Sequence, residues 1–481
     1  MRVLRRLGVG WELYGDGSAP PPGASVKPHE RLSWGRTTGL GAQHVVAMFG
    51  ATFVFPIVMG LDPNVAIMMS GLATMIFLLI TAGKVPSYLG TSASFVGAAV
   101  IISPGGENPA VLTGAILVAG GVLALSGLII HLLGPTVILA VFPPVVTGGV
   151  VMLIGFKLAP VVADLYWPME QWIALLTMCF VVLATVLLRG FLARITILLG
   201  LVFGFVMSVI FDATFGPHTA HDSEGAVIHD GMRVDLSEVA EAPWIGLPDF
   251  HSPSFETTAV LIALPAVIAL IAENAGHVKA VQEMTKTDLN PYVGRAIFAD
   301  GVATSLASSV GGSPTTTYAE NIGVMAATRV YSTAAYWVAA LVAVLFGLCP
   351  KFGALVAATP DGVLGGITVV LYGMIGLLGA KIWIENRVDF ANPIVLVPVA
   401  AGLIAGIGGV SMTFGEGFEI EGIALGTIIL LVGYHLLHWI APAHMRPAPT
   451  DLSPHTTATD ATEATTLPGH ANHPPSTDPR T

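Results

Sequence analysis

Two ionisable residues lie four positions apart inside an apolar stretch of the sequence. Glu273 and His277 both belong to the motif AENAGH, and this spacing places their side chains on one face of a helix. There they could share a proton or hold a hydrogen-bonding ligand. A carboxylate–imidazole pair could instead simply join two helices, but ionisable groups at membrane depth are costly and are usually functional. We therefore interpret the pair as a chemical centre.

A second carboxylate, Glu320, lies in the polar stretch GGSPTTTYAENIGVMAATR between apolar ones. Its TTTY run is β-branched and aromatic and favours an extended segment, whereas NIGVMAATR favours a short helix. Glu320 would therefore stand at the start of a half-helix, where backbone N–H groups are free and the helix dipole is positive.

A similar stretch, YLGTSASFVGAAV, occurs in the first part of the chain. There we predict that SAS, residues 92–94, is extended and that the following residues are helical. Pairing of the two extended pieces would satisfy backbone groups at membrane depth. Both helix starts would then face one point, which suits a small, planar, hydrogen-bonding solute.

Two further ionisable residues lie inside apolar segments. Asp300, in FADGVATS, could contact a ligand or could hold neighbouring loops by hydrogen bonds. His44, in GAQHVVAMFG, could carry a proton or could join two helices through a hydrogen bond. For both, a supporting role is the simpler interpretation.

The composition is that of a membrane protein. Of 481 residues, 54% are hydrophobic and only 11% are charged, and the mean hydropathy is +0.77, whereas soluble domains carry about a quarter charged residues. We find no signal peptide. The two cysteines, Cys179 and Cys349, suggest neither a disulfide framework nor a metal site. The net charge of -11 argues against a nucleic-acid partner, and we predict no metal and no cofactor.

Apolar windows of about 20 residues, long enough to cross a bilayer, recur along the chain. The third and tenth are short and polar, and they contain the two stretches described above. The sequence thus predicts an all-α polytopic membrane protein with short paired β-strands in segments 3 and 10. The fourteen predicted spans cover residues 40–60, 64–82, 86–103, 109–133, 137–156, 169–188, 193–213, 256–277, 293–310, 315–330, 332–349, 353–379, 391–409 and 420–440.

The positive charges support this count. With both termini in the cytoplasm, all but three of the 20 Lys and Arg residues fall on the cytoplasmic side, as the positive-inside rule expects. The exceptions are Lys157, Arg233 and Lys351. An acidic insert divides the spans into seven and seven, and two halves with odd span numbers have opposite orientations. This arrangement predicts an inverted repeat.

Five regions follow from these boundaries. The tail is rich in Pro, Thr, Ala and Asp and cannot bury enough apolar surface to fold, and its irregularly spaced histidines do not favour metal capture. The regions are a cytoplasmic N-terminal segment (1–37), a first seven-span repeat (38–213), an acidic extracellular loop (214–255), a second seven-span repeat (256–440) and a disordered cytoplasmic tail (441–481).

Several motifs are similar to those of one transporter family. QHVVAMFGATFVFP, YLGTSASF, AENAGH, FADG and ENIGVMAATR resemble the nucleobase-ascorbate transporter, or uracil-xanthine permease, family. The resemblance extends from about Leu40 to Ile440 and is greatest to the pyrimidine-utilisation and uracil permeases. The family signature is filled here by Glu320, Asn321, Gly323, Thr328 and Arg329.

The resemblance implies a proton-coupled symporter that imports uracil and other pyrimidines across the cell membrane, and not an enzyme. It implies an elevator-like motion of a core domain, spans 1–4 and 8–11, against a gate domain, spans 5–7 and 12–14. The expected partners are a nucleobase, a proton and the lipid bilayer, and the family leads us to expect a homodimer.

The resemblance also implies which groups bind the substrate. Glu273 and Glu320 would accept hydrogen bonds from ring N–H groups, and the backbone amides of Ala93 and Ala319 would donate to carbonyl oxygens.

Other residues are implied to assist. His277 would help to bind substrate and proton, and Tyr318 would lie against the substrate ring. The residues implied to support the site or the proton coupling are His44, Asp300, Asn321 and Ser92.

The size of the substrate stays open. Glu320 resembles the uracil-transporting branch, since Gln at this position is typical of purine transporters. However, Ala93 stands where uracil permeases typically have Phe, and Ala319 where they have Gly. The lost ring would leave room for a thymine methyl group or a purine, so a xanthine or purine permease is the nearest alternative. An anion transporter would want a basic residue in place of Glu320, and a membrane enzyme would need a nucleophile or a metal.

Overall fold

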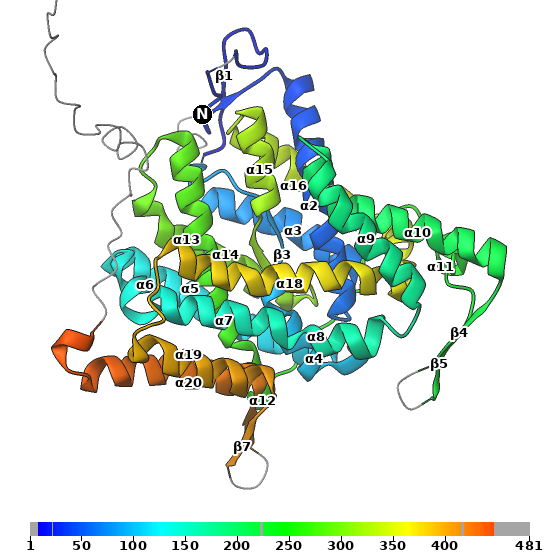
Figure 1. Cartoon of the computed structure of the whole chain (residues 1–481). Helices are drawn as coiled ribbons and strands as arrows, with labels where there is room; N and C mark the ends of the chain where they lie inside the picture. Colours follow the sequence, from blue (N-terminus) through cyan, green and yellow to red (C-terminus); the bar gives the residue numbers. More distant parts are fainter. Residues whose placement is uncertain (1–7, 22, 222–224, 415–417, 447–481) are drawn as a thin grey trace, which may run out of the picture. The chain divides into compact units, whose positions relative to one another are not determined.

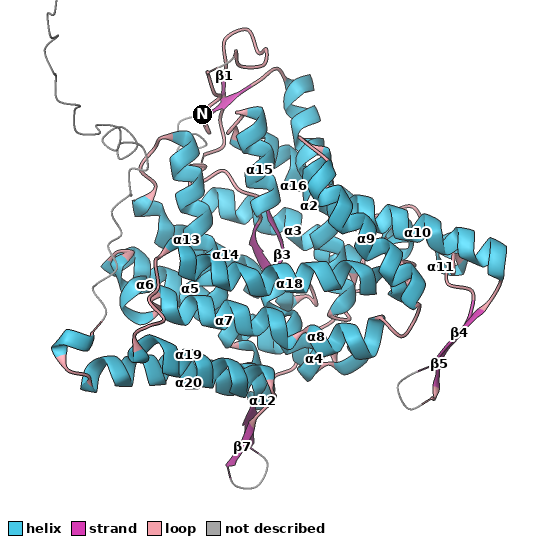
Figure 2. Cartoon of the chain, viewed as in Figure 1, coloured by secondary structure: helices cyan, strands magenta, loops and turns pink. Residues whose placement is uncertain are grey.

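The structure, a computed structural model, describes residues 8–21, 23–221, 225–414 and 418–446. Most of the tail predicted over 441–481, from residue 447 onward, lies outside the described residues. Helices make up most of the described chain (Figure 1), and short strand pairs lie among and beside them (Figure 2).

The longer helices and all the strands have the following bounds. The helices are α2 Trp34–Val58, α3 Pro63–Ile80, α4 Val96–Ile102, α5 Pro109–Leu133, α6 Thr136–Val141, α7 Pro144–Lys157, α9 Gln171–Leu187, α10 Thr196–Phe215, α11 Ser237–Glu241, α12 Thr257–Ala263, α13 Pro265–Thr285, α14 Val293–Ser309, α15 Ala319–Thr328, α16 Thr333–Gly347, α17 Pro350–Ala357, α18 Asp361–Glu385, α19 Pro393–Ile407 and α20 Gly422–Ile440. The strands are β1 Glu12–Leu13, β2 Glu30–Arg31, β3 Leu89–Thr91, β4 His218–His221, β5 Val227–Gly231, β6 Thr315–Thr317, β7 Ser411–Phe414 and β8 Phe418–Glu421.

The described helices are those of a polytopic membrane protein. Eight of them are long and apolar enough to cross a membrane, or nine if α16 and α17, which meet at a bend of 82°, form one span. This confirms the mostly helical, multi-span class. The count of fourteen spans, the inverted repeat and the five-region division stay predictions.

The two polar stretches do contain paired strands. β3 and β6 run antiparallel, with Leu89 opposite Thr317 and Thr91 opposite Thr315. The TTT strand lies where it was predicted, but the prediction of an extended SAS was wrong. Of these three residues only Ser92 keeps an extended backbone.

The early turn into a helix has a local cause. The side chain of Ser92 accepts a hydrogen bond from the backbone N–H of Ser94 at 3.2 Å, which is the capping contact that starts helical turns. A 3₁₀ helix, η1 (Ala93–Phe95), therefore begins directly after Ser92 and leads into α4.

Two predicted span boundaries were also wrong. The span predicted over 353–379 is divided between α17 and α18, which are separated near Pro360. A proline removes a backbone donor and disfavours helix at the preceding residue, so the chain restarts as α18 at Asp361. The span predicted to end at residue 277 continues to Thr285.

The helices pack in two sets. In the first set, α5 and α13 pack along α14, α16 packs against α2 and α3, and α15 packs against α2, with β3 and β6 among them. In the second set, α18 packs against α7 and α9, α10 packs against α9, and α19 packs against α20 (Figure 1). Glycines allow these close contacts: a Cβ on Gly204 of α10 would lie 2.6 Å from the Thr177 hydroxyl oxygen of α9, and small residues let membrane helices approach closely.

The insert after α10 contacts both sets. Its Arg233 donates from Nε to Glu170 Oε2 at 2.8 Å and from a terminal nitrogen to Asp212 Oδ1 at 3.0 Å, which ties the insert to α9 and α10. Farther along, Ser254 N donates to Ala110 O at 2.8 Å, at the start of α5. The insert therefore joins the ends of helices from both sets.

Candidate binding site

A cavity of about 550 Å³ lies between the two sets of helices. Each set supplies one wall, and the walls differ in character. The cavity is lined by Ala47, Gly50, Ala51, Phe55, Thr91, Ala93, Thr185, Ala193, Ile195, Thr196, Ile197, Leu198, Glu273, Thr316, Tyr318, Ala319, Glu320, Gly323, Leu371, Met374, Ile375 and Leu378.

The polar wall comes from α13, β6 and α15. It carries two carboxylates, Glu273 and Glu320, with the Thr316 side chain between their elements. Glu320 is exposed and Glu273 is partly exposed, although both lie well inside the chain's apolar segments. Carboxylate oxygens accept hydrogen bonds and do not donate them. This wall can therefore hold a ligand that presents two N–H groups.

The opposite wall comes from α10 and α18. Its side chains are mostly apolar, including Ile197, Leu198, Met374 and Leu378. A hydrocarbon surface facing two carboxylates suits a flat ligand with one polar edge and one apolar edge.

Hydrogen bonds among threonines fix β6 beneath the polar wall. Thr315 N donates to Thr304 Oγ1 at 3.1 Å, and Thr304 Oγ1 in turn donates to Thr315 O at 3.1 Å. Thr315 Oγ1 also donates to Asp300 Oδ1 at 3.4 Å. Asp300 is completely buried on α14, so it lies behind the cavity and holds the strand.

Tyr318 joins the two broken segments. Its hydroxyl donates to Thr91 O at 2.8 Å and accepts from Thr52 Oγ1 at 3.2 Å. Its ring lies against Gly90, where a Cβ would collide with the ring and would lie 2.6 Å from Thr52 Oγ1. Only glycine leaves room for this crossing. Tyr318 lines the cavity with only 4% of its surface exposed.

The two helix starts lie at the cavity, although the first begins earlier than predicted, within SAS. Ala93 begins η1 and Ala319 begins α15, and both line the cavity. The first backbone N–H groups of any helix have no partner within that helix. At α15 the residue before the helix, Tyr318, makes no capping bond with its side chain. The amides at this start are therefore suited to a ligand's carbonyl oxygen.

A chain of hydrogen bonds connects His277 to Asp300. The Nδ1 atom of His277 lies 2.7 Å from Thr317 Oγ1, which lies 3.3 Å from Asn274 Oδ1. Asn274 Nδ2 donates to Asp300 Oδ2 at 2.6 Å. His277 does not line the cavity; it lies one helical turn beyond Glu273, against β6.

Asn274 and Thr317 were not among the predicted site residues. Both could have been found in the sequence, because Asn274 lies between Glu273 and His277 in AENAGH, and Thr317 is the last threonine of TTT. Buried polar side chains at membrane depth need partners, and these two are partners for each other.

His44 and Asn321 form a second buried cluster. Asn321 Nδ2 donates to His44 O at 2.9 Å and lies 3.2 Å from His44 Nδ1. The His44 ring packs against the Tyr336 ring at a tilt of 34°, with ring centroids 4.3 Å apart. These contacts join α2, α15 and α16 directly behind Glu320.

The predicted residues thus fall into two groups. Those lining the cavity are Glu273, Ala93, Tyr318, Ala319 and Glu320. Those held behind it or beside it are His277, His44, Asp300, Asn321 and Ser92, which the cavity lining does not include.

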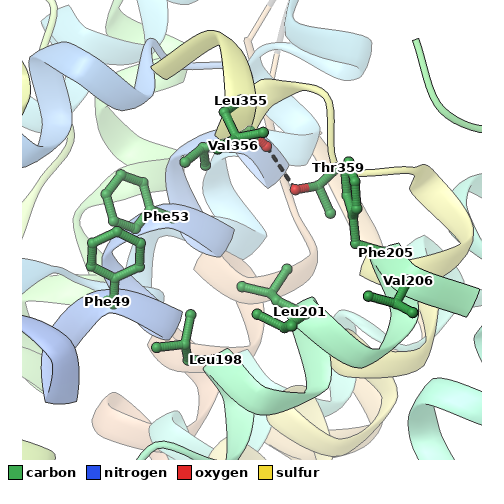
Figure 3. Close-up of a pocket in the computed structure, with 10 residues that line it drawn as sticks. Phe49, Phe53, Leu198, Leu201, Phe205, Val206, Leu355, Val356 and Thr359 are labelled. Atoms are coloured by element: carbon green, nitrogen blue, oxygen red, sulfur yellow. Dashed lines mark hydrogen bonds between the residues drawn. The ribbon is translucent and has the colours of Figure 1, made fainter. Parts of the chain in front are cut away.

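A smaller apolar hollow of about 210 Å³ adjoins the cavity. Phe49 and Phe53 of α2 face Leu198 and Leu201 of α10 across it, and Val356 lies at its upper edge (Figure 3). Leu198 lines both spaces. The described lining of this hollow offers no carboxylate, so the polar cavity is the candidate binding site.

Comparisons with known proteins show which proteins the chain resembles. A model of the permease family matches residues 35–414. The chain is 44% identical over 425 residues to a protein of Escherichia coli (strain K12) named as the pyrimidine permease RutG. The aligned region covers 87% of this chain and 92% of RutG. The chain is 35% identical over 435 residues to the uracil permease of Bacillus caldolyticus, covering 87% and 95% of the two chains.

Solved structures share the fold at low sequence identity. The transmembrane domain of the cyanobacterial bicarbonate transporter BicA has a TM-score of 0.55 at 15% identity, covering 85% of this chain and 99% of that chain. The murine anion transporter Slc26a9 in its inward-facing state has a TM-score of 0.58 at 10% identity, covering 83% and 68%.

Proposed function

The chain belongs to the permease family, and from that premise we propose that it imports uracil and related pyrimidine bases together with a proton. The members of this family are transporters and not enzymes. The observation that carries the choice of substrate is the two-sided cavity, in which Glu273 and Glu320 face an aliphatic wall.

Uracil matches this cavity group by group. Its two ring N–H groups can donate to the carboxylates, and its two carbonyl oxygens can accept from the helix-start amides at Ala93 and Ala319. Its carbon edge can lie against the aliphatic wall of α18. The names of the relatives, uracil permease and pyrimidine permease, support this choice.

An anion is a poor fit to the same cavity. Although the structural neighbours carry bicarbonate or other anions, none of the described residues that line this cavity is Lys or Arg. Two carboxylates would repel an anion in a space with little water. The likeness to those proteins therefore extends to the fold only.

We propose that the proton removes one negative charge from the carboxylate cluster. An uncompensated charge costs several kcal/mol to carry through a low-dielectric region. With a proton shared between Glu273 and the neighbouring His277, the loaded site crosses more easily than the empty, charged one. Coupling of proton and substrate then follows from electrostatics.

The moving parts we propose are the predicted core domain, spans 1–4 and 8–11, and the predicted gate domain, spans 5–7 and 12–14. The cavity between two sets of helices supports alternating access between them. Two helix contacts, of α5 with α14 and of α3 with α16, also support an inverted repeat. These helices lie in predicted spans 4 and 9 and in predicted spans 2 and 11. In an inverted repeat span 4 corresponds to span 11 and span 2 to span 9, so the two contacts are equivalent. Cytoplasmic termini and a homodimer complete the proposal.

The test is uptake in permease-deficient cells. We expect labelled uracil to accumulate, and an uncoupler that dissipates the proton gradient to abolish accumulation. Glu273→Gln should lose accumulation, whereas Glu283→Gln, the same change at an exposed position of the same helix, should keep it. Accumulation of uracil by Glu273→Gln at the wild-type rate would contradict the scheme.

A xanthine or purine permease is the second candidate. The observation that favours it is Ala93, whose small side chain leaves the cavity wide at the first helix start. Competition against labelled uracil by unlabelled thymine, xanthine and uric acid separates the two. Stronger competition by xanthine than by uracil would favour the purine assignment.

A further inference from the structure

The hydrogen-bond chain from Asp300 to His277 has a direction. We propose that Asn274 and Thr317 act as positioning residues that keep the His277 proton on Nδ1, so that Nε2 is the nitrogen ready to accept a proton. The role in transport rests on the proposed function, but the tautomer is a property of the protein alone.

The orientation of the Asn274 amide is the first step. Its Nδ2 lies 3.0 Å from Leu270 O and 2.6 Å from Asp300 Oδ2. A backbone carbonyl oxygen can only accept a hydrogen bond, so the amide nitrogen must be on that side. The reversed amide would place its oxygen against two other oxygens. Oδ1 of Asn274 is therefore the atom that faces Thr317.

The Thr317 hydroxyl is the second step. Asn274 is completely buried, and its Oδ1 needs a donor, which Thr317 Oγ1 supplies at 3.3 Å. A hydroxyl has one proton but can also accept. Having donated to Asn274, the Thr317 oxygen accepts from His277 Nδ1 at 2.7 Å. Reversing this bond would leave the carboxamide oxygen facing the hydroxyl oxygen with no proton between them.

The imidazole ring is the third step. A neutral ring carries one N–H, and the hydrogen bond made by one nitrogen decides which nitrogen bears it. With the proton on Nδ1, the Nε2 lone pair is free. Proton uptake at Nε2 then needs no ring rotation and leaves the bond to Thr317 intact. The ionisable groups connected to this ring are Glu273, one helical turn before it on the same helix, and Asp300 on α14, at the other end of the hydrogen-bond chain.

Nitrogen NMR of the purified protein tests the tautomer without any transport assay. With ¹⁵N-labelled histidine and a pH at which the ring is neutral, a protonated ring nitrogen and an unprotonated one have well-separated shifts. The signal that disappears in His277→Gln belongs to His277. We expect the Nδ1–H form. A spectrum showing the Nε2–H form in the wild-type protein would overturn the proposal.

Variants of Thr317 test the role in transport. Thr317→Val removes the hydroxyl at nearly constant volume and should give a mixed tautomer and a maximal uptake rate about tenfold lower, with the KM changed less than about threefold. Thr317→Ser keeps the hydroxyl and should restore both the tautomer and the rate. Thr368→Val is the control, because this buried hydroxyl bonds only within its own helix, to Leu364 O at 2.7 Å and Gly365 O at 3.2 Å.

Four results separate the possible failures. An unchanged tautomer in Thr317→Val, or an equal loss of rate in Thr317→Ser, would overturn the positioning role. If Thr317→Val does not fold, the wild-type spectrum still decides the tautomer. If the protein does not transport uracil at all, the proposed function is wrong and the uptake measurements cannot be made. The NMR measurement of the His277 tautomer still tests the positioning role.

Discussion

In the first broken segment a three-residue strand, β3, leads through Ser92 into a helix start at Ala93. In the second, a three-residue strand, β6, leads through Tyr318 into a helix start at Ala319. The order of elements is the same. At the first start, however, the residue before the helix, Ser92, binds a backbone N–H with its side chain, whereas at the second the residue before the helix, Tyr318, does not, and Glu320 follows directly.

This difference assigns different tasks to the two segments. The first has one amide, that of Ser94, bound by its own serine, and it contributes small side chains, so beyond the Ala93 amide it mainly sets the shape of the cavity. The second adds a carboxylate to its helix-start amide, so it supplies most of the recognition. Tyr318 links the two by crossing Gly90 and bonding to the Thr91 backbone. The following predictions test this division, beginning with the largest effect.

Glu320→Gln should remove recognition by the second segment. It replaces an acceptor-only carboxylate by an amide that can also donate, and hydrogen bonds to charged groups contribute about 1.5–3 kcal/mol. We expect uracil affinity to fall about ten- to hundredfold, measured by binding to the purified protein. The thermal unfolding midpoint should stay close to wild type. Unchanged affinity would remove Glu320 from the site.

Gly90→Ala should disrupt the crossing of the two segments. The added Cβ would collide with the Tyr318 ring, and overpacking of this kind costs about 1–3 kcal/mol. We expect a lower unfolding midpoint in detergent and reduced uptake. Gly121→Ala on α5 is the control, since a Cβ there meets nothing within 4 Å. Equal midpoints for the two variants would show that the crossing is not tight.

Ala93→Phe should narrow the cavity at the first segment without removing a recognition group. A phenyl ring there occupies the space beside the substrate, so we expect uracil uptake to persist while competition by thymine and xanthine weakens about tenfold, or about 1.4 kcal/mol. The measurement is inhibition of labelled uracil uptake by each base. Equal weakening for uracil and for the larger bases would contradict a role in shape alone.

Ser92→Ala should have the smallest effect. Loss of a serine cap costs about 0.5–1 kcal/mol, so the unfolding midpoint should fall slightly while the KM for uracil changes less than about twofold. A large rise in KM would mean that recognition depends on the Ser92 cap as strongly as on the second segment, and the division between the segments would fail.

The sequence predicted the parts of this site that depend on local chemistry. The β-branched TTT run is the strand β6, and Glu320 stands at a helix start, because both features follow from propensities within a few residues. Glu273 also lies at the cavity, since a carboxylate in an apolar helix has few other stable positions.

Sequence reasoning failed where the structure depends on a distant partner or a small capping contact. The extended SAS was wrong because one hydroxyl, Ser92 Oγ, was enough to start a helical turn. The link from His277 through Thr317 and Asn274 to Asp300 was missed, because it joins α13, β6 and α14 only after folding. Gly90 has its role only because Tyr318, far along the chain, lies across it.

The crossing of Tyr318 over Gly90 also has a consequence for biosynthesis. The Tyr318 hydroxyl and the Thr91 carbonyl that it binds are 227 residues apart in the chain. At a synthesis rate of about 5–20 residues per second, β3 therefore leaves the ribosome roughly 10 to 45 seconds before β6. Unpaired backbone groups are not stable in contact with lipid, so the first broken segment must be sheltered until the second arrives. The binding site can be assembled only when about two thirds of the protein has been made.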